Sequence, residues 1–116
     1  MKTYLSIIIP TFNSAETLPR LLDSISKEKP KDTEIIIVDD CSAEDLNKNY
    51  NNYNRYKIYK LKMNRGPAYA RNYGAKKAKG EALLFLDSDV IVLSGTITEV
   101  VRIFKEDKYR VAATGV

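Results

Sequence analysis

The feature that most constrains this chain is the stretch Leu83–Val92 (LLFLDSDVIV), in which a short apolar run is interrupted by two acids one residue apart. Four apolar residues precede Asp87, and three more follow Asp89. A short apolar run bounded by polar residues predicts a strand that is buried on both faces, as in a parallel sheet. Because an ionised carboxylate is costly to bury without a partner, both acids are expected where the strand ends.

The two acids predict a ligand site at the edge of that sheet. In open α/β sheets the carboxyl ends of the strands form the ligand crevice. Two carboxylates in that position suit a hard divalent cation that carries a phosphate ligand. The chain has no histidine, and Cys41 is its only cysteine, so imidazole sites and cysteine-based zinc sites are excluded. Any metal must therefore be held by oxygen atoms.

The remaining sequence alternates between strand and helix patterns, which predicts an α/β fold with a mostly parallel sheet and helices on both faces. Further strands are expected at Tyr4–Pro10, Glu34–Val38, Tyr56–Leu61 (an edge strand) and Arg110–Thr114. Helices are expected from about Thr17 to Pro30, at Pro67–Lys79 and at Thr96–Asp107, with a short weak helix at Ala43–Lys48. A length of 116 residues allows one domain, spanning 1–116.

Two local patterns refine these expectations. Asn13 and Glu16 have the spacing of a capping box ahead of the first helix. The helix that begins at Pro67 is rich in alanine and also contains Gly74, and such small residues allow a helix to lie close to a sheet or to a ligand.

Positive charge is concentrated in one part of the chain. The net charge is +4, and no acid lies between Asp45 and Glu81, where ten lysines and arginines are found. Such a stretch is ordinarily a solvated surface, but it can also attract a phosphorylated ligand, anionic lipid or nucleic acid. We assign most of these residues to the solvated surface and reserve Arg65 and Arg71 for a functional role. No signal segment or membrane-length apolar run is present, so a cytoplasmic location is expected.

A second acidic strand end, Asp39-Asp40, strengthens the ligand hypothesis. The ordinary alternative is that acids and serines after a strand cap the next helix. Two acidic strand ends that face one crevice favour ligand binding instead. The residues after the first strand, Pro10-Thr11-Phe12-Asn13, contain no glycine-rich turn, so dinucleotide and P-loop sites are excluded. The order of the acids also does not fit an aspartyl phosphatase or a phospho-receiver domain.

Four sequence blocks together resemble the N-terminal half of a family 2 glycosyltransferase with the GT-A fold, a three-layer, Rossmann-like fold that binds nucleotide-diphospho-sugars. The blocks occur in the family's order and cover nearly the whole chain. They are Ile7–Asn13 (IIIPTFN), Ile37–Ser42 (IVDDCS), Asn64–Gly74 (NRGPAYARNYG) and Leu86–Asp89 (LDSD).

The resemblance implies a metal-dependent transferase that binds a nucleotide-diphospho-sugar, with UDP as the nucleotide, and transfers the sugar to an acceptor with inversion, as in polysaccharide biosynthesis. The implied cofactor is Mn²⁺ or Mg²⁺, held by Asp87 and Asp89 as the DXD motif. The implied nucleotide-binding residues are Pro10, Thr11, Asn13, Asp39, Asp40, Gly66, Arg71 and Asp87.

The resemblance also implies parts that this sequence does not supply. No catalytic base is identified, and the base is expected beyond Val116, so the domain is expected to be incomplete and its sheet truncated at the C-terminus. Exposed strand edges would then favour a homodimer. The acceptor is a glycan, a lipid-linked sugar or a protein. Association with the inner face of the membrane is compatible with the sequence, and nucleic acid is not an expected partner.

Two other functions stay open. The first is a nucleotide-sugar-binding or regulatory module that has kept the fold and lost catalysis, which the isolated chain's capacity for glycosyl transfer would decide. The second is a domain that binds an anionic surface or RNA through the basic stretch, although its tyrosines lack a recognisable RNA-binding framework.

Overall fold

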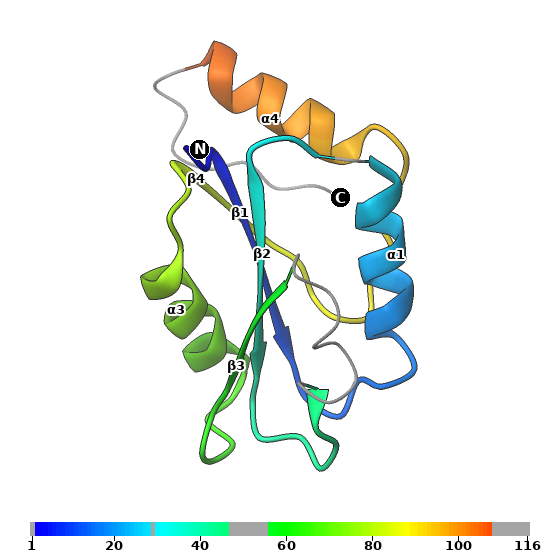
Figure 1. Ribbon diagram of the computed structural model, residues 1–116, viewed down its shortest axis with the longest axis vertical. Coiled ribbons are helices and arrows are strands. Elements are labelled where there is room, and N and C mark those ends of the chain that lie inside the picture. The colour runs from blue at the N-terminus through cyan, green and yellow to red at the C-terminus, as the bar shows by residue number, and fades with distance from the viewer. Residues whose placement is uncertain (1, 29, 47–55, 108–116) are drawn as a thin grey trace.

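The computed structural model describes residues 2–28, 30–46 and 56–107 of the chain (Figure 1). The expected strand Arg110–Thr114 lies outside the described residues, as does part of the expected helix Ala43–Lys48.

In the part of the chain that the structure describes, four parallel strands form the central sheet in the order β3-β2-β1-β4. They are β1 (Leu5–Thr11), β2 (Thr33–Asp39), β3 (Tyr56–Lys60) and β4 (Ala82–Phe85). β1 pairs with both β2 and β4, and β2 pairs with β3. Leu5 lies opposite Thr33 and Thr11 lies opposite Asp39, so β1 and β2 begin and end together.

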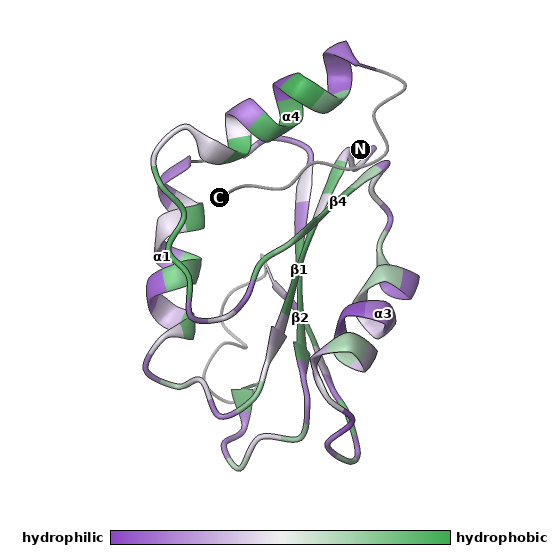
Figure 2. Cartoon of the chain, turned by 180° about the vertical axis from the view of Figure 1, so that it is seen from behind, coloured by the Kyte–Doolittle hydropathy of each residue, from purple (hydrophilic) through white to green (hydrophobic). Residues whose placement is uncertain are grey.

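Helices cover both faces of this sheet, as the strand–helix alternation predicts. Helices α1 (Leu18–Glu28) and α4 (Thr96–Glu106) pack on one face, and α3 (Pro67–Lys77) packs on the other (Figure 1). Because side chains alternate along a strand, the central strands supply two separate cores. Ile7, Ile9, Ile35 and Ile37 join the core under α1, and Ile8, Ile36 and Val38 join the core under α3. Figure 2 shows the hydrophobic residues of these strands and the mixed character of the helices.

The prediction that the acidic strand is buried on both faces is wrong. β4 ends at Phe85, and its residues alternate between half-buried and exposed, with Leu83 and Phe85 about two-fifths exposed. The physical reason is its place in the sheet: among the described residues β4 pairs on one side only, with β1. The residues after it form no strand, and Val90 and Ile91 among them are exposed.

The capping box expected at Asn13 and Glu16 is also not formed. Helix α1 begins at Leu18, with Pro19 in its first turn, where a missing N–H does no harm. The amide N–H of Leu18 donates to the backbone oxygen of Ser14 at 2.9 Å. The Asn13 side chain makes a different contact, with the loop after β2.

Helix α3 lies unusually close to the sheet because of one glycine. A Cβ atom placed on Gly74 would be 2.6 Å from Cγ2 of Ile8 and 3.1 Å from Cγ2 of Val38. Real side chains do not approach each other at 2.6 Å, so only glycine fits at this point of the helix. Gly74 therefore sets the distance between α3 and the central strands.

A buried acid, Glu34, joins the amino ends of the strands. Its Oε1 accepts a hydrogen bond from Nζ of Lys57 at 2.8 Å, and its Oε2 accepts one from Oγ of Ser6 at 2.5 Å and one from the N–H of Lys79 at 2.6 Å. Burial by itself raises the pKa of Glu34, but these hydrogen bonds and the charge of Lys57 outweigh it and hold the pKa below its usual value. The ionised carboxylate thus ties three strands to the segment after α3.

Within the part of the chain that the structure describes, none of the helices combines the length and the apolar character needed to cross a bilayer.

The close approach at Gly74 generates a test of the fold. An alanine in a helix normally stabilises it relative to glycine by roughly 0.5–1 kcal/mol. We expect Gly74→Ala to lower the free energy of unfolding by about 1–3 kcal/mol instead, because its Cβ must displace Ile8 and Val38. Urea denaturation measures the change. The matched control is Asn72→Ala at an exposed position of α3, which should be neutral or slightly stabilising; a stabilised Gly74→Ala would contradict the packing.

Candidate functional site

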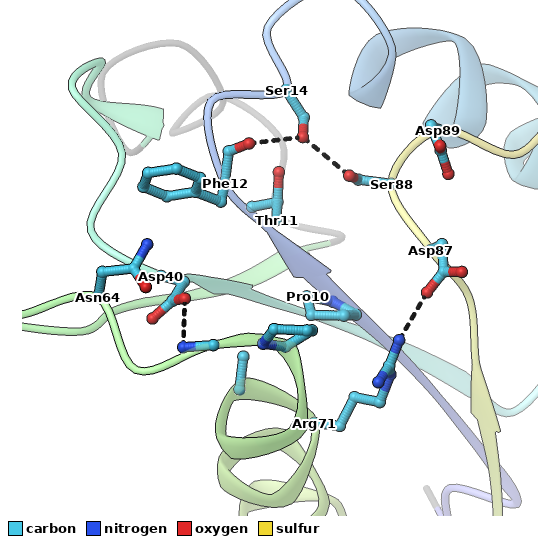
Figure 3. A pocket seen from close by; sticks show the side chains of 13 residues that line it. Pro10, Thr11, Phe12, Ser14, Asp40, Asn64, Arg71, Asp87, Ser88 and Asp89 are labelled. Carbon is cyan, nitrogen blue, oxygen red and sulfur yellow. Dashed lines mark hydrogen bonds and ion pairs between the residues drawn. The ribbon is translucent and has the colours of Figure 1, made fainter.

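A cleft of about 450 Å³ opens at the carboxyl ends of the strands (Figure 3), within the usual size range of small-molecule sites. Its walls come from the end of β1, from the loops after β1, β2, β3 and β4, and from the start of α3. The residues that line it are Pro10, Thr11, Phe12, Ser14, Asp40, Asn64, Gly66, Pro67, Ala70, Arg71, Asp87, Ser88 and Asp89. Asp40 and Asp89, which are 49 positions apart in the sequence, therefore share one cleft, as expected for strand ends that meet at one edge.

Asp40 holds one wall of the cleft in place. Its Oδ1 accepts a hydrogen bond from the N–H of Arg65 at 2.7 Å, and its Oδ2 accepts one from the N–H of Gly66 at 2.8 Å. The side chain is buried, and Gly66 has a φ of 92°, a left-handed conformation that favours glycine. Asp40 thereby joins the end of β2 to the residue that precedes α3. The orientation of the helix and of its Arg71 depends on this contact.

Asp39 and Asn13 lie outside the cleft lining and connect the loops below it. Oδ1 of Asp39 accepts hydrogen bonds from the N–H and the Oγ of Ser42. The N–H of Asn13 donates to Oγ of Ser42 at 2.8 Å, and Oδ1 of Asn13 accepts from the N–H of Ala43 at 3.0 Å. These contacts fix the loop after β1 against the loop after β2. Their roles as nucleotide ligands stay predictions, and the contacts in this structure are structural.

Thr11 brings an unused hydroxyl group to the floor of the cleft. Its side chain is almost completely buried, and its Oγ1 has no hydrogen-bond partner among the described residues. The same holds for Oδ2 of Asp39, which lies opposite Thr11 in the β1–β2 pair. Buried polar atoms normally find a partner, so this end of the sheet has spare hydrogen-bonding capacity.

The other wall of the cleft carries opposite charges. Nη2 of Arg71, on α3, lies 2.9 Å from Oδ1 of Asp87, in the loop after β4. The next residue, Ser88, shares a 2.8 Å hydrogen bond with Ser14 from the loop after β1. Figure 3 shows both contacts and places Asp89 beyond Ser88. The Asp89 side chain is exposed and makes no ion pair or hydrogen bond with a described residue.

The donor set on this wall fits a hard divalent cation. Two carboxylates one residue apart, Asp87 and Asp89, border the cleft, and Asp89 is not engaged. Mg²⁺ and similar ions are commonly held by one or two carboxylates and complete their shell with water and phosphate oxygens. No group of three or more acids, cysteines or histidines that could enclose a metal is found in residues 2–28, 30–46 and 56–107. A cation here would therefore complete its shell with water or with oxygen atoms of a bound ligand.

The structure places most, but not all, of the predicted site residues in the cleft. Arg65 does not line it, because its guanidinium lies 5.1 Å from the ring centre of Tyr69. Sequence reasoning missed the exposed ring of Phe12 and the Ser14–Ser88 contact. Phe12 lies inside the block Ile7–Asn13, so its position next to Thr11 could have indicated it. No local signal predicts the serine pair, whose members are 74 residues apart.

Comparisons with known proteins agree on one family. Residues 6–116 match the family model described as Glycosyl transferase family 2. An uncharacterized glycosyltransferase of Haemophilus influenzae is 34% identical over 103 residues, which are 89% of this chain and 35% of that protein. The poly(ribitol-phosphate) beta-N-acetylglucosaminyltransferase TarS of Staphylococcus aureus is 36% identical over 100 residues, which are 81% of this chain and 18% of that protein.

Solved structures agree with the sequence comparisons. The crystal structure of S. aureus TarS 1-349 matches with a TM-score of 0.81 and 32% identity over 98% of this chain and 38% of that chain. TarS 1-349 in complex with UDP-GlcNAc matches with a TM-score of 0.78 and 36% identity over 91% of this chain and 32% of that one. The mannosyltransferase PcManGT from Pyrobaculum calidifontis, in complex with GDP-Man and Mn²⁺, shares the fold, with a TM-score of 0.78 at 22% identity over 90% of this chain and 33% of that chain. The chain thus spans 18–38% of these relatives' own length.

The contacts of Asp40 generate a test of its structural role. Asp40→Asn replaces one acceptor oxygen by an NH₂ group, which cannot accept the N–H of Arg65 or Gly66. We expect the free energy of unfolding to fall by about 1–3 kcal/mol, because a buried donor loses its partner. Asp89→Asn, at an exposed position of the same cleft, should change it by less than about 0.5 kcal/mol. Urea denaturation curves of equal midpoint for the two variants would contradict the structural role of Asp40.

Proposed function

Because this chain belongs to glycosyl transferase family 2, we propose that its cleft binds the nucleoside diphosphate part of a sugar donor, with UDP as the nucleotide. Its parallel sheet between two helical layers has the GT-A architecture. The observation that carries the proposal is that Asp40, Arg71, Asp87 and Asp89 line one cleft, although they come from three separate segments of the chain. Similarity to TarS, whose structures include complexes with UDP and UDP-GlcNAc, supports UDP.

The wall formed by Asp40 is the proposed nucleoside end. A carboxylate has about four lone-pair positions, and the N–H groups of Arg65 and Gly66 occupy two of them. The remaining positions can accept a hydrogen bond from the N3–H of a uracil ring. Phe12, whose side chain is about half exposed at the cleft, offers an aromatic face for the same base. Gly66 has no side chain, so the nucleoside can approach the backbone there.

The wall formed by Asp87 and Asp89 is the proposed diphosphate end. Breaking the bond between the anomeric carbon and the phosphate oxygen leaves a nucleoside diphosphate, on which negative charge grows. A bound Mn²⁺ or Mg²⁺ would stabilise this charge as a Lewis acid. Arg71 can supply a second positive group, because a guanidinium pairs well with phosphate oxygens. Its present contact with Asp87 keeps the guanidinium at the edge of the cleft, within reach of such a ligand.

The described residues account for donor binding but not for activation of the acceptor. Every carboxylate that lines the cleft is assigned to the nucleoside or to the cation, so none is left to deprotonate an acceptor. We therefore assign donor binding to this part of the protein and the choice of acceptor and the general base to residues outside the described ranges. The same observation favours a second candidate, a donor-binding module without catalysis. Glycosyl transfer, or slow hydrolysis of a UDP-sugar, by this chain would exclude that second candidate.

The role of Asp89 generates a test of the proposed function. We expect isothermal titration calorimetry to show UDP binding that depends on Mn²⁺ or Mg²⁺ and that weakens at least about tenfold in Asp89→Asn, because a charged metal ligand is lost. Stability should be unchanged, since the side chain is exposed and makes no contact that supports the fold.

The matched control is Asp23→Asn, which removes one negative charge from the exposed surface of α1. Its affinity for UDP with the metal should equal that of the wild type. If Asp89→Asn binds UDP and metal as tightly as Asp23→Asn does, the metal assignment is wrong. If none of the three proteins binds UDP, the proposed donor is wrong.

The edge of β4 generates a further expectation, a homodimer. Within the described residues β4 has no strand on its outer side, and Leu83 and Phe85 are exposed next to that edge. Unpaired apolar edges favour strand pairing between copies. We expect static light scattering to show dimers at high protein concentration and Phe85→Lys to return the protein to monomers. Leu93→Lys, at an equally apolar position that is exposed elsewhere, should stay dimeric; a monomeric wild type would contradict the expectation.

A further inference from the structure

One face of the molecule is rich in lysine and arginine. It consists of the outward side of α3, the neighbouring edge strand β3 and the loop that joins them, residues 56–80, and this segment contains no aspartate or glutamate. In Figure 1 α3 lies on the outside of the sheet, and no other described element covers it. We call this surface the basic face and define it by Lys62, Arg65, Lys76, Lys77 and Lys79.

Among the described residues, the cations of the basic face are not neutralised by neighbouring acids, whereas several cations on the opposite layer are. On the opposite layer Lys27 pairs with Asp23, and Arg102 pairs with Glu99 and Glu106. None of the five residues of the basic face forms an ion pair with an acid of the described ranges. The face therefore keeps a local excess of positive charge, which attracts an anionic surface over a distance of about 10 Å at 0.1 M salt.

Exposed apolar side chains lie among these charges. Met63 is 55% exposed and Tyr69 is 44% exposed, and they adjoin Lys62 and Arg65. A surface that combines lysines with exposed apolar and aromatic groups suits the boundary between lipid head groups and acyl chains. Since neither side chain packs into the core, their exposure costs hydrophobic free energy that contact with lipid would recover.

From this combination we propose that the basic face docks the protein onto the surface of an anionic membrane. The cleft lies next to this face, because Asn64 and Gly66 belong both to the loop of the basic face and to the cleft wall. Docking places the mouth of the cleft near the lipid head groups. The inference does not require that the cleft bind a nucleotide sugar.

The aromatic residues of the same face favour lipid over single-stranded RNA. RNA-binding surfaces present open ring faces on which bases stack. Here Tyr59 and Tyr73 meet edge to face at 5.8 Å between ring centres, and Nζ of Lys77 lies 5.5 Å from each ring centre. The guanidinium of Arg65 lies over the ring of Tyr69 at 5.1 Å. The protein's own cations thus occupy the ring faces that a base would use.

Flotation with lipid vesicles tests the proposal. The protein is mixed at low and moderate salt with vesicles of phosphatidylcholine alone or of phosphatidylcholine with phosphatidylglycerol. We expect binding to the anionic vesicles only, and weaker binding at the higher salt. The variant Lys62→Gln/Lys76→Gln/Lys79→Gln should partition onto them roughly 100-fold more weakly, because each lysine near the surface contributes separately. Met63→Ser should weaken binding by a smaller factor.

The matched control, Arg20→Gln/Lys27→Gln/Lys31→Gln, removes the same charge from exposed positions outside the basic face. It should bind like the wild type. Equal loss in both triple variants would show a general charge effect and overturn the proposal, as would binding to neutral vesicles or no binding to either kind. A single-stranded RNA that binds the wild type more tightly than the anionic vesicles would replace lipid as the partner. UDP titration of the first triple variant should be unchanged, so a failed flotation leaves the proposed function to be judged separately.

Discussion

The arrangement of the whole site depends on the parallel pairing of β1 with β2. Two parallel strands in register end at the same edge, and here Thr11 lies opposite Asp39. Side chains alternate across a strand, so consecutive residues serve different faces. Asp39 turns to the side of α1 and fixes the loops through Ser42, whereas Asp40 holds the backbone ahead of α3. Two adjacent acids thus acquire different roles from the pleat of one strand.

The close approach of α3 to the sheet also matters, because it positions the charged wall of the cleft. Gly74 lets the helix approach Ile8, and Asp40 holds the backbone of Gly66 just before the helix begins. Arg71 lies between these two points on α3 and meets Asp87 from the loop after β4. The ion pair therefore joins α3 to the loop after β4.

Much of this fold could be predicted from the sequence. The buried runs Ile7–Ile9 and Ile35–Ile37, the proline at the start of α3 and the amphipathic pattern of α4 each determine an element through local residues, and their predicted and observed bounds agree within about three residues. That both acidic strand ends line one cleft also followed, since parallel strands end together. The four sequence blocks that resemble the family predicted the same fold, and the comparisons confirmed the family and the fold.

What could not be predicted depends on residues distant in the sequence. The burial of β4 depends on how many strands flank it, which its apolar run does not encode. Asn13 has the spacing of a cap, but the N–H of Ala43, 30 residues later, takes its oxygen. Arg65 and Arg71 are equally basic and only six positions apart. The guanidinium of Arg65 lies over an aromatic ring outside the cleft, whereas that of Arg71 pairs with an acid at the cleft. Such choices between competing partners are settled only by the packed structure.

The central place of β1 has a consequence for how the chain reaches this structure. β1 leaves the ribosome before both of its neighbours in the sheet, which begin at Thr33 and Ala82. The run Ile7–Ile9, which is fully buried in the folded protein, cannot pair on both sides until both neighbouring strands have been synthesised. Every pairing in the sheet joins segments that are distant in the sequence. Formation of this sheet should therefore be slow, and the apolar run of β1 stays exposed until both neighbouring strands have been synthesised.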